Sequence, residues 1–113
     1  MTVNSRIHKL TFFGSGGPTS AMLIVTLRNG GKMNLELMLP NWSEACGQKG
    51  ATLLLACANQ LLAAYMSQTP VNIDYEIQPP PTSLPWITRI EFGGVVNAIP
   101  APTAENAKLC PLP

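Results

Sequence analysis

Residues 14–20, GSGGPTS, form the segment whose composition best suits the binding of an anion. Backbone N–H groups and the hydroxyls of Ser15, Thr19 and Ser20 could turn inward and form a nest for a phosphate. The segment matches neither the GxxxxGK[ST] nor the GxGxxG pattern, and it leads into a predicted strand instead of a helix N-terminus. A flexible loop between adjacent strands is therefore the interpretation that we favour.

Arginine would supply the counter-charge for such a ligand, because its planar guanidinium binds phosphate or carboxylate through paired hydrogen bonds. The predicted ligand-binding residues are Ser15, Gly16, Gly17, Thr19, Ser20, Arg28 and Arg89, with Lys9 and Lys32 as further counter-charges. Together they would hold a small phosphorylated or nucleotide-like molecule at a junction between subunits.

Two carboxylates stand close together in a segment with strand periodicity. Asp74 and Glu76 are two residues apart, so both side chains would lie on one side of the strand. Paired carboxylates can act as general acid and base, but such a pair more often lies on the solvated face of a sheet. His8 has no acid or nucleophile beside it in the sequence. We therefore assign no catalytic residue, and the sequence favours a protein that is not an enzyme.

Cysteine and histidine are too few and too scattered for a structural zinc site. Cys46 and Cys57 fall in a predicted helix and would lie roughly 16 Å apart along its axis, too far for a disulfide. Cys110 could reach either one, but reduced thiols in a reducing compartment are the simpler interpretation. We expect no metal and no cofactor.

The chain carries little charge. Charged residues make up 12% of its 113 residues, about half the typical share, and the formal net charge is +1. Copies of such a chain repel one another weakly, which favours self-association. The small net charge supplies no field for a polyanion, so nucleic acid is not an expected partner. Without a signal peptide or a run of about 18 apolar residues, the sequence predicts a soluble cytoplasmic protein.

Apolar periodicity predicts five strands and one helix. The strands are expected within residues 6–13, 21–28, 33–39, 71–78 and 86–97, the last with a bulge or bend at Gly93 and Gly94. The helix is expected from about residue 44 to residue 67, with Asn41 or Ser43 as its cap and Glu44 in its first turn.

The order β-β-β-α-β-β predicts an α+β two-layer sandwich, in which one long helix packs on an antiparallel sheet of about five strands. This domain would cover residues 1–99, and the proline-rich residues 100–113 would form an extended tail.

The predicted helix has a polar arc and an unusually wide apolar one. The polar arc consists of Gln48, Lys49, Thr52, Asn59, Gln60 and Ser67. Apolar residues cover the other 200° or so, about twice what a surface helix needs. A second copy of the chain would cover the additional apolar side, through Leu54, Leu55, Ala58, Leu62 and Tyr65. A helix sunk into a strongly curled sheet would produce the same pattern.

Three functions therefore remain open, and the least favoured of them is a small enzyme that uses Asp74 and Glu76. The favoured one is a non-enzymatic, homo-oligomeric assembly or interaction module, such as a small accessory or structural protein of a virus or mobile element. The alternative is sequestration of the small anionic ligand by residues 14–20 and the arginines.

Overall fold

The computed structural model describes residues 1–14, 21–28, 31–39, 47–77 and 84–99. Within these ranges a mixed seven-stranded sheet packs against one 20-residue helix. The strands are β1 (Thr2–Ser5), β2 (Ile7–Gly14), β3 (Ala21–Leu27), β4 (Met33–Leu39), β5 (Val71–Glu76), β6 (Trp86–Phe92) and β7 (Val95–Ala98), and the helix is α2 (Gln48–Ser67). The α+β class and the packing of a long helix on a sheet are confirmed.

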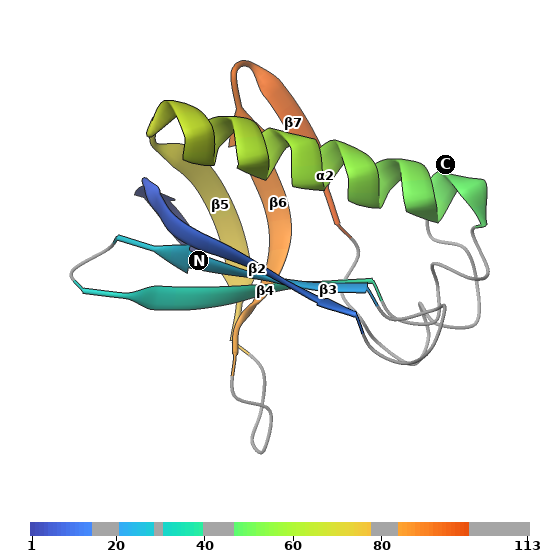
Figure 1. The fold of residues 1–113 in the computed structure, drawn as a ribbon, viewed down its shortest axis with the longest axis horizontal. Coiled ribbons are helices and arrows are strands. Elements are labelled where there is room, and N and C mark those ends of the chain that lie inside the picture. Colours follow the sequence, from blue (N-terminus) through green and yellow to red (C-terminus); the bar gives the residue numbers. More distant parts are fainter. Residues whose placement is uncertain (15–20, 29–30, 40–46, 78–83, 100–113) are drawn as a thin grey trace.

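The two edge strands of the sheet, β1 and β2, follow each other in the chain. β1 and β2 are separated only by Arg6, yet β1 pairs with β5 while β2 pairs with β3. Between those partners the order runs β5-β6-β4-β3. Figure 1 shows β2, β3 and β4 side by side, β5 and β6 running across them, and α2 lying over the sheet. The result is a small, strongly curled sheet whose two edge strands, β1 and β2, do not pair with each other.

The contact between β4 and β6 makes the sheet mixed. These two strands are parallel and share a single register pair, Glu36 with Trp86. The Glu36 N–H also donates to the Pro85 carbonyl at 2.8 Å. β7 pairs with β6 farther along, from Arg89 to Phe92.

The core lies between the inner face of the sheet and α2. Alternate strand residues fill it, as the period of two predicts, and α2 contributes Cys57, Leu61 and Ala64 at helical spacing. The fully buried strand residues include Ile7, Leu23, Val25, Leu27, Leu35, Leu37, Val71, Ile73, Ile87 and Ile90. α2 is long and apolar enough to cross a membrane by composition alone, but these contacts are those of the core helix of a globular domain.

β1 was not predicted. Its four residues alternate regularly, with Val3 and Ser5 buried and Thr2 and Asn4 exposed. The strand is held by a segment about 70 residues away: the Thr2 hydroxyl donates to Asp74 Oδ1 at 2.7 Å, and the Asn4 amide donates to the Asn72 amide oxygen.

The last predicted strand is a hairpin. Gly93 and Gly94 have φ values of 63° and 78° and form a two-residue turn, because Phe92 pairs directly with Val95. Two consecutive positive φ values are typical of a type I′ turn, whose twist matches that of paired strands. The expected bulge or bend at these glycines is therefore corrected to a chain reversal that creates β7.

α2 begins later than predicted. Gly47 has φ 56° and ψ −122°, which is not helical, so the first helical residue is Gln48. The first turn contains no acidic residue and no side-chain cap, which corrects the placement of Glu44. The candidate caps Asn41 and Ser43 lie outside the described residues. The helix ends at Ser67, as predicted, and Gln68 follows in the left-handed conformation.

Gln60 joins α2 to the β6–β7 hairpin. Sequence analysis placed it on the polar arc, but only 8% of it is exposed. Its Nε2 donates to the carbonyls of Val95 at 2.7 Å and Phe92 at 3.3 Å, and its Oε1 accepts from Asn97 at 2.9 Å. These bonds turn the polar side of α2 partly toward the sheet.

We expect Gln60→Ala to lower the free energy of unfolding by about 1–3 kcal/mol, because it removes all three bonds and leaves a half-buried partner, Asn97, unsatisfied. Urea unfolding at one protein concentration, low enough to exclude dimers, measures the loss. Asn59→Ala is the matched control, since Asn59 is exposed on the same helix and should cost less than about 0.5 kcal/mol. Equal losses for the two variants would show that the hairpin contacts contribute nothing.

Candidate functional site

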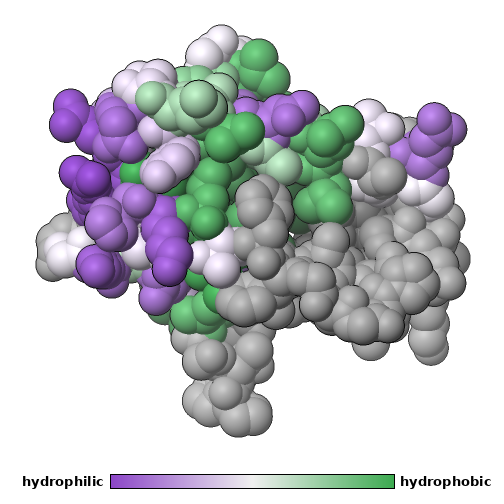
Figure 2. Space-filling view, in the orientation of Figure 1, coloured by the Kyte–Doolittle hydropathy of each residue, from purple (hydrophilic) through white to green (hydrophobic). Residues whose placement is uncertain are grey.

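The side of α2 that faces away from the sheet is exposed and carries three large apolar residues. Leu55, Leu62 and Met66 expose 62%, 44% and 75% of their surface. With Asn59 they follow the spacing i, i+4, i+7 and i+11, which places them on one stripe. We call these four residues the outer face of α2. Figure 2 shows apolar side chains reaching the surface along the helix.

The predicted interface residues divide into two groups. Leu55 and Leu62 lie on the outer face, and Tyr65 is 38% exposed beside it. Leu54 packs against the core instead, and Ala58 is half-buried. Met66, the most exposed of the large apolar residues, was missed, although its position within the wide apolar arc was a signal for it.

Exposure of the outer face follows from the rotation of α2 about its axis. Five of the six residues of the polar arc are exposed and only Gln60 is buried, yet Leu55, Leu62 and Met66 of the apolar arc are exposed as well. The curled sheet covers one side of the helix, with Cys57, Leu61 and Ala64 inward, but it does not cover the opposite side. The wide apolar arc is therefore only partly explained by burial in the sheet.

The residues predicted to bind an anion are not brought together within the described ranges. Residues 15–20 lie outside them. Arg28 follows the end of β3 that is opposite to Ala21, where that segment joins the strand; the length of β3 is about 23 Å. Arg89 lies on β6, which does not pair with β3. The ligand site stays a prediction.

Arg89 has its own carboxylate partners. Its guanidinium lies 3.0 Å from Glu91 Oε2 and 3.7 Å from Asp74 Oδ2. Register explains the contact with Asp74, because Asp74 and Arg89 are opposite each other on β5 and β6. The positive charge of Arg89 is thus largely balanced where it stands.

Asp74 and Glu76 do not share a common partner. Asp74 binds Thr2 and Arg89, whereas Glu76 Oε2 accepts from Trp86 Nε1 at 3.3 Å. A register irregularity lies between Asp74 and Tyr75. Nothing in this geometry directs both carboxylates at one reacting atom, so neither is assigned a catalytic role.

Cys57 is a free thiol in the core. Burial disfavours the thiolate and raises the pKa of this thiol from 9.0 to about 11. A thiol with so high a pKa is protonated at neutral pH and is a poor nucleophile. Cys57 is therefore a packing residue. Among the residues that the structure describes, no group of three His, Cys, Asp or Glu side chains could hold a metal ion.

A shallow depression of about 470 Å³ lies between the start of α2 and β7. Its lining consists of Gln48, Lys49, Thr52, Leu53, Ala56 and Asn97. Among the described residues, the lining carries one cation and no carboxylate, so these residues offer no acid–base pair.

Comparisons of the chain with protein-family models, with curated proteins and with solved structures found no match.

Proposed function

We propose that this protein is a non-enzymatic module that associates with copies of itself through the outer face of α2. The observation that carries the proposal is the exposure of Leu55, Leu62 and Met66 on one stripe of a helix whose other side is already packed. Large apolar residues gathered in one exposed patch mark interaction surfaces.

A second copy is the occupant that the charges favour. Lys49 is the only charged residue of α2, and it stands in the first turn, away from Leu62 and Met66. Two identical faces of this kind can meet about a twofold axis without like-charge repulsion. Asn59, in the middle of the stripe, could form a hydrogen bond with its counterpart.

The size of the face limits the strength of the association. A helix of 20 residues is about 30 Å long, and a strip about 10 Å wide along it amounts to roughly 300 Å² per partner, below the roughly 800 Å² of a standard interface. We therefore expect a weak dimer that dissociates on dilution.

The test compares lysine substitutions on two sides of α2. We expect Leu55→Lys and Leu62→Lys each to abolish dimers, because each places a desolvated charge opposite its copy, and to leave the circular dichroism spectrum unchanged. Sedimentation velocity over about a hundredfold range of concentration measures the association.

Ser67→Lys is the matched control. It adds the same charge to the same helix at an exposed position, about 140° around the axis from Leu62, and should associate as the unaltered chain does. A protein that is monomeric at every concentration, or dimers that survive both leucine substitutions, would refute the proposal.

A further inference from the structure

The net charge of +1 conceals an uneven distribution of charge along the chain. Residues 1–35 contain four Lys or Arg residues, one His and no Asp or Glu. The remaining residues contain three Lys or Arg and six Asp or Glu. A polyanion responds to the local field and not to the average over the chain, so the position of these cations in the fold decides whether they act together.

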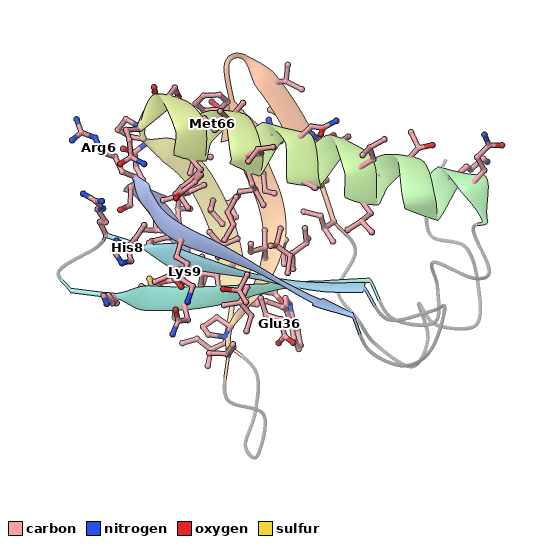
Figure 3. All side chains as sticks on the ribbon, in the orientation of Figure 1. Arg6, His8, Lys9, Glu36 and Met66 are labelled. Atoms are coloured by element: carbon pink, nitrogen blue, oxygen red, sulfur yellow. The ribbon has the colours of Figure 1, made fainter. Side chains whose placement is uncertain are left out.

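Strand pairing brings all five basic side chains to one end of the sheet. The Arg28 N–H donates to the Arg6 carbonyl at 3.0 Å, so these two arginines are neighbours on paired strands. Lys9 is opposite Thr26, which in turn is opposite Asn34. We call Arg6, His8, Lys9, Arg28 and Lys32 the basic cluster. Figure 3 labels its first three members at the same end of the sheet, and hydrophilic residues gather over that end in Figure 2.

A register irregularity at His8 concentrates the cluster. Ile7 pairs with Leu27 and Lys9 with Thr26, so His8 is an additional residue on β2. Such a bulge turns consecutive side chains toward the same side of a strand. His8 is half-buried, whereas Arg6, Lys9, Arg28 and Lys32 are exposed.

The cations of the cluster are not neutralised within the described part of the chain. Both ion pairs found there belong to Arg89, and they engage Asp74 and Glu91 on the other half of the sheet. Like charges on neighbouring strands repel one another and destabilise a sheet. A cluster of this kind is therefore better suited to an external anion than to stabilising the fold.

We propose that the basic cluster binds the phosphate backbone of single-stranded nucleic acid, without reading its sequence. Neighbouring strands are about 4.8 Å apart and residues rise about 3.3 Å, so the cluster is about 10 Å across. That extent suits a few successive phosphates of one strand, to which arginine forks and lysine ammonium groups bind. Beyond Lys9 and Asn34 the next row of the sheet contains the buried Glu36 and the exposed Glu76. The carboxylate of Glu76 limits the contact.

The geometry favours nucleic acid over a membrane surface. Leu10, next to Lys9, points toward the core that α2 covers, so Lys9 lies on the opposite face of the sheet. The apolar outer face of α2 looks away from the sheet on the other side. The basic cluster and the apolar stripe therefore cannot both rest on one flat bilayer.

Fluorescence anisotropy with a labelled oligothymidine of about 20 nucleotides tests the proposal at about 50 mM and about 200 mM salt. We expect binding at the lower salt concentration, with a slope of log K against log salt near −3, since four permanent cations each contribute about −0.7. Arg28→Gln and Lys9→Gln should each weaken binding about three- to tenfold and reduce the slope by about 0.7.

Lys49→Gln is the matched control, because it removes one exposed cation outside the cluster and should change the affinity less than about twofold. The proposal is overturned by an absence of binding at low salt, by equal losses for Lys49→Gln and Arg28→Gln, or by binding to phosphatidylserine vesicles with none to the oligonucleotide. Measured below the concentration at which dimers form, the result is independent of self-association through α2.

Discussion

Leu61→Ala is expected to lower the free energy of unfolding by about 2–5 kcal/mol, whereas Leu62→Ala should lower it by less than about 1 kcal/mol. The two leucines are adjacent in the sequence and identical in chemistry, but Leu61 is fully buried and Leu62 is 44% exposed. Truncation of Leu61 removes its transfer free energy and leaves a cavity between α2 and the sheet.

Urea unfolding of both variants at one low protein concentration, with the slope of the transition checked for constancy, measures the difference. Low concentration keeps any contribution of dimers out of the comparison. Similar losses for the two leucines would mean that α2 has a different orientation about its axis, and the outer face would then consist of other residues.

High pH is expected to destabilise the protein through Cys57. In the fold the pKa of this thiol is about 11, against the ordinary value of 9.0 for a thiol exposed in the unfolded chain. Below pH 9 the thiol is protonated in both states and its ionisation does not affect stability. As the pH rises from 9 to 11 the unfolded state loses the proton first, so the free energy of unfolding falls, by up to about 3 kcal/mol for a shift of this size.

The measurement is the free energy of unfolding as a function of pH, compared between the unaltered chain and Cys57→Ala. Tyrosines, lysines and the other two cysteines are present in both proteins, so the difference between the curves isolates Cys57. We expect that difference to be constant below pH 9 and to shrink above it. Parallel curves up to pH 11 would show that the thiol ionises as easily in the fold as in the unfolded chain.

Local periodicity predicted the elements whose neighbours are close in sequence. Met33, Leu35 and Leu37 alternate with polar residues, and the structure has β4 there with Leu35 and Leu37 buried. β5 and the end of α2 at Ser67 agree in the same way. In β4 and β5 a single face carries most of the apolar residues, so the pattern alone determines which residues go inward.

Long-range pairing explains what could not be predicted. β1 has one large apolar residue, Val3, and owes its structure to β5. The orientation of α2 about its axis could not be predicted either, because a wide apolar arc allows several orientations. The hydrogen bonds of Gln60 to the β6–β7 hairpin select one of them. The basic cluster depends on the pairing of β2 with β3, so its members look scattered in the sequence.

The curled sheet has one weak junction, the contact between β4 and β6. On one side the two halves of the molecule, β2-β3-β4 and β1-β5-β6-β7, are joined by continuous chain at Arg6. On the other they meet at one register pair, Glu36 with Trp86. Local opening of the native state should begin at the contact between β4 and β6, with Arg6 as the hinge. Separating these two strands breaks fewer hydrogen bonds than separating the strands within either half. Since Arg6 belongs to the basic cluster, a ligand bound to the cluster would also limit how far the two halves move apart.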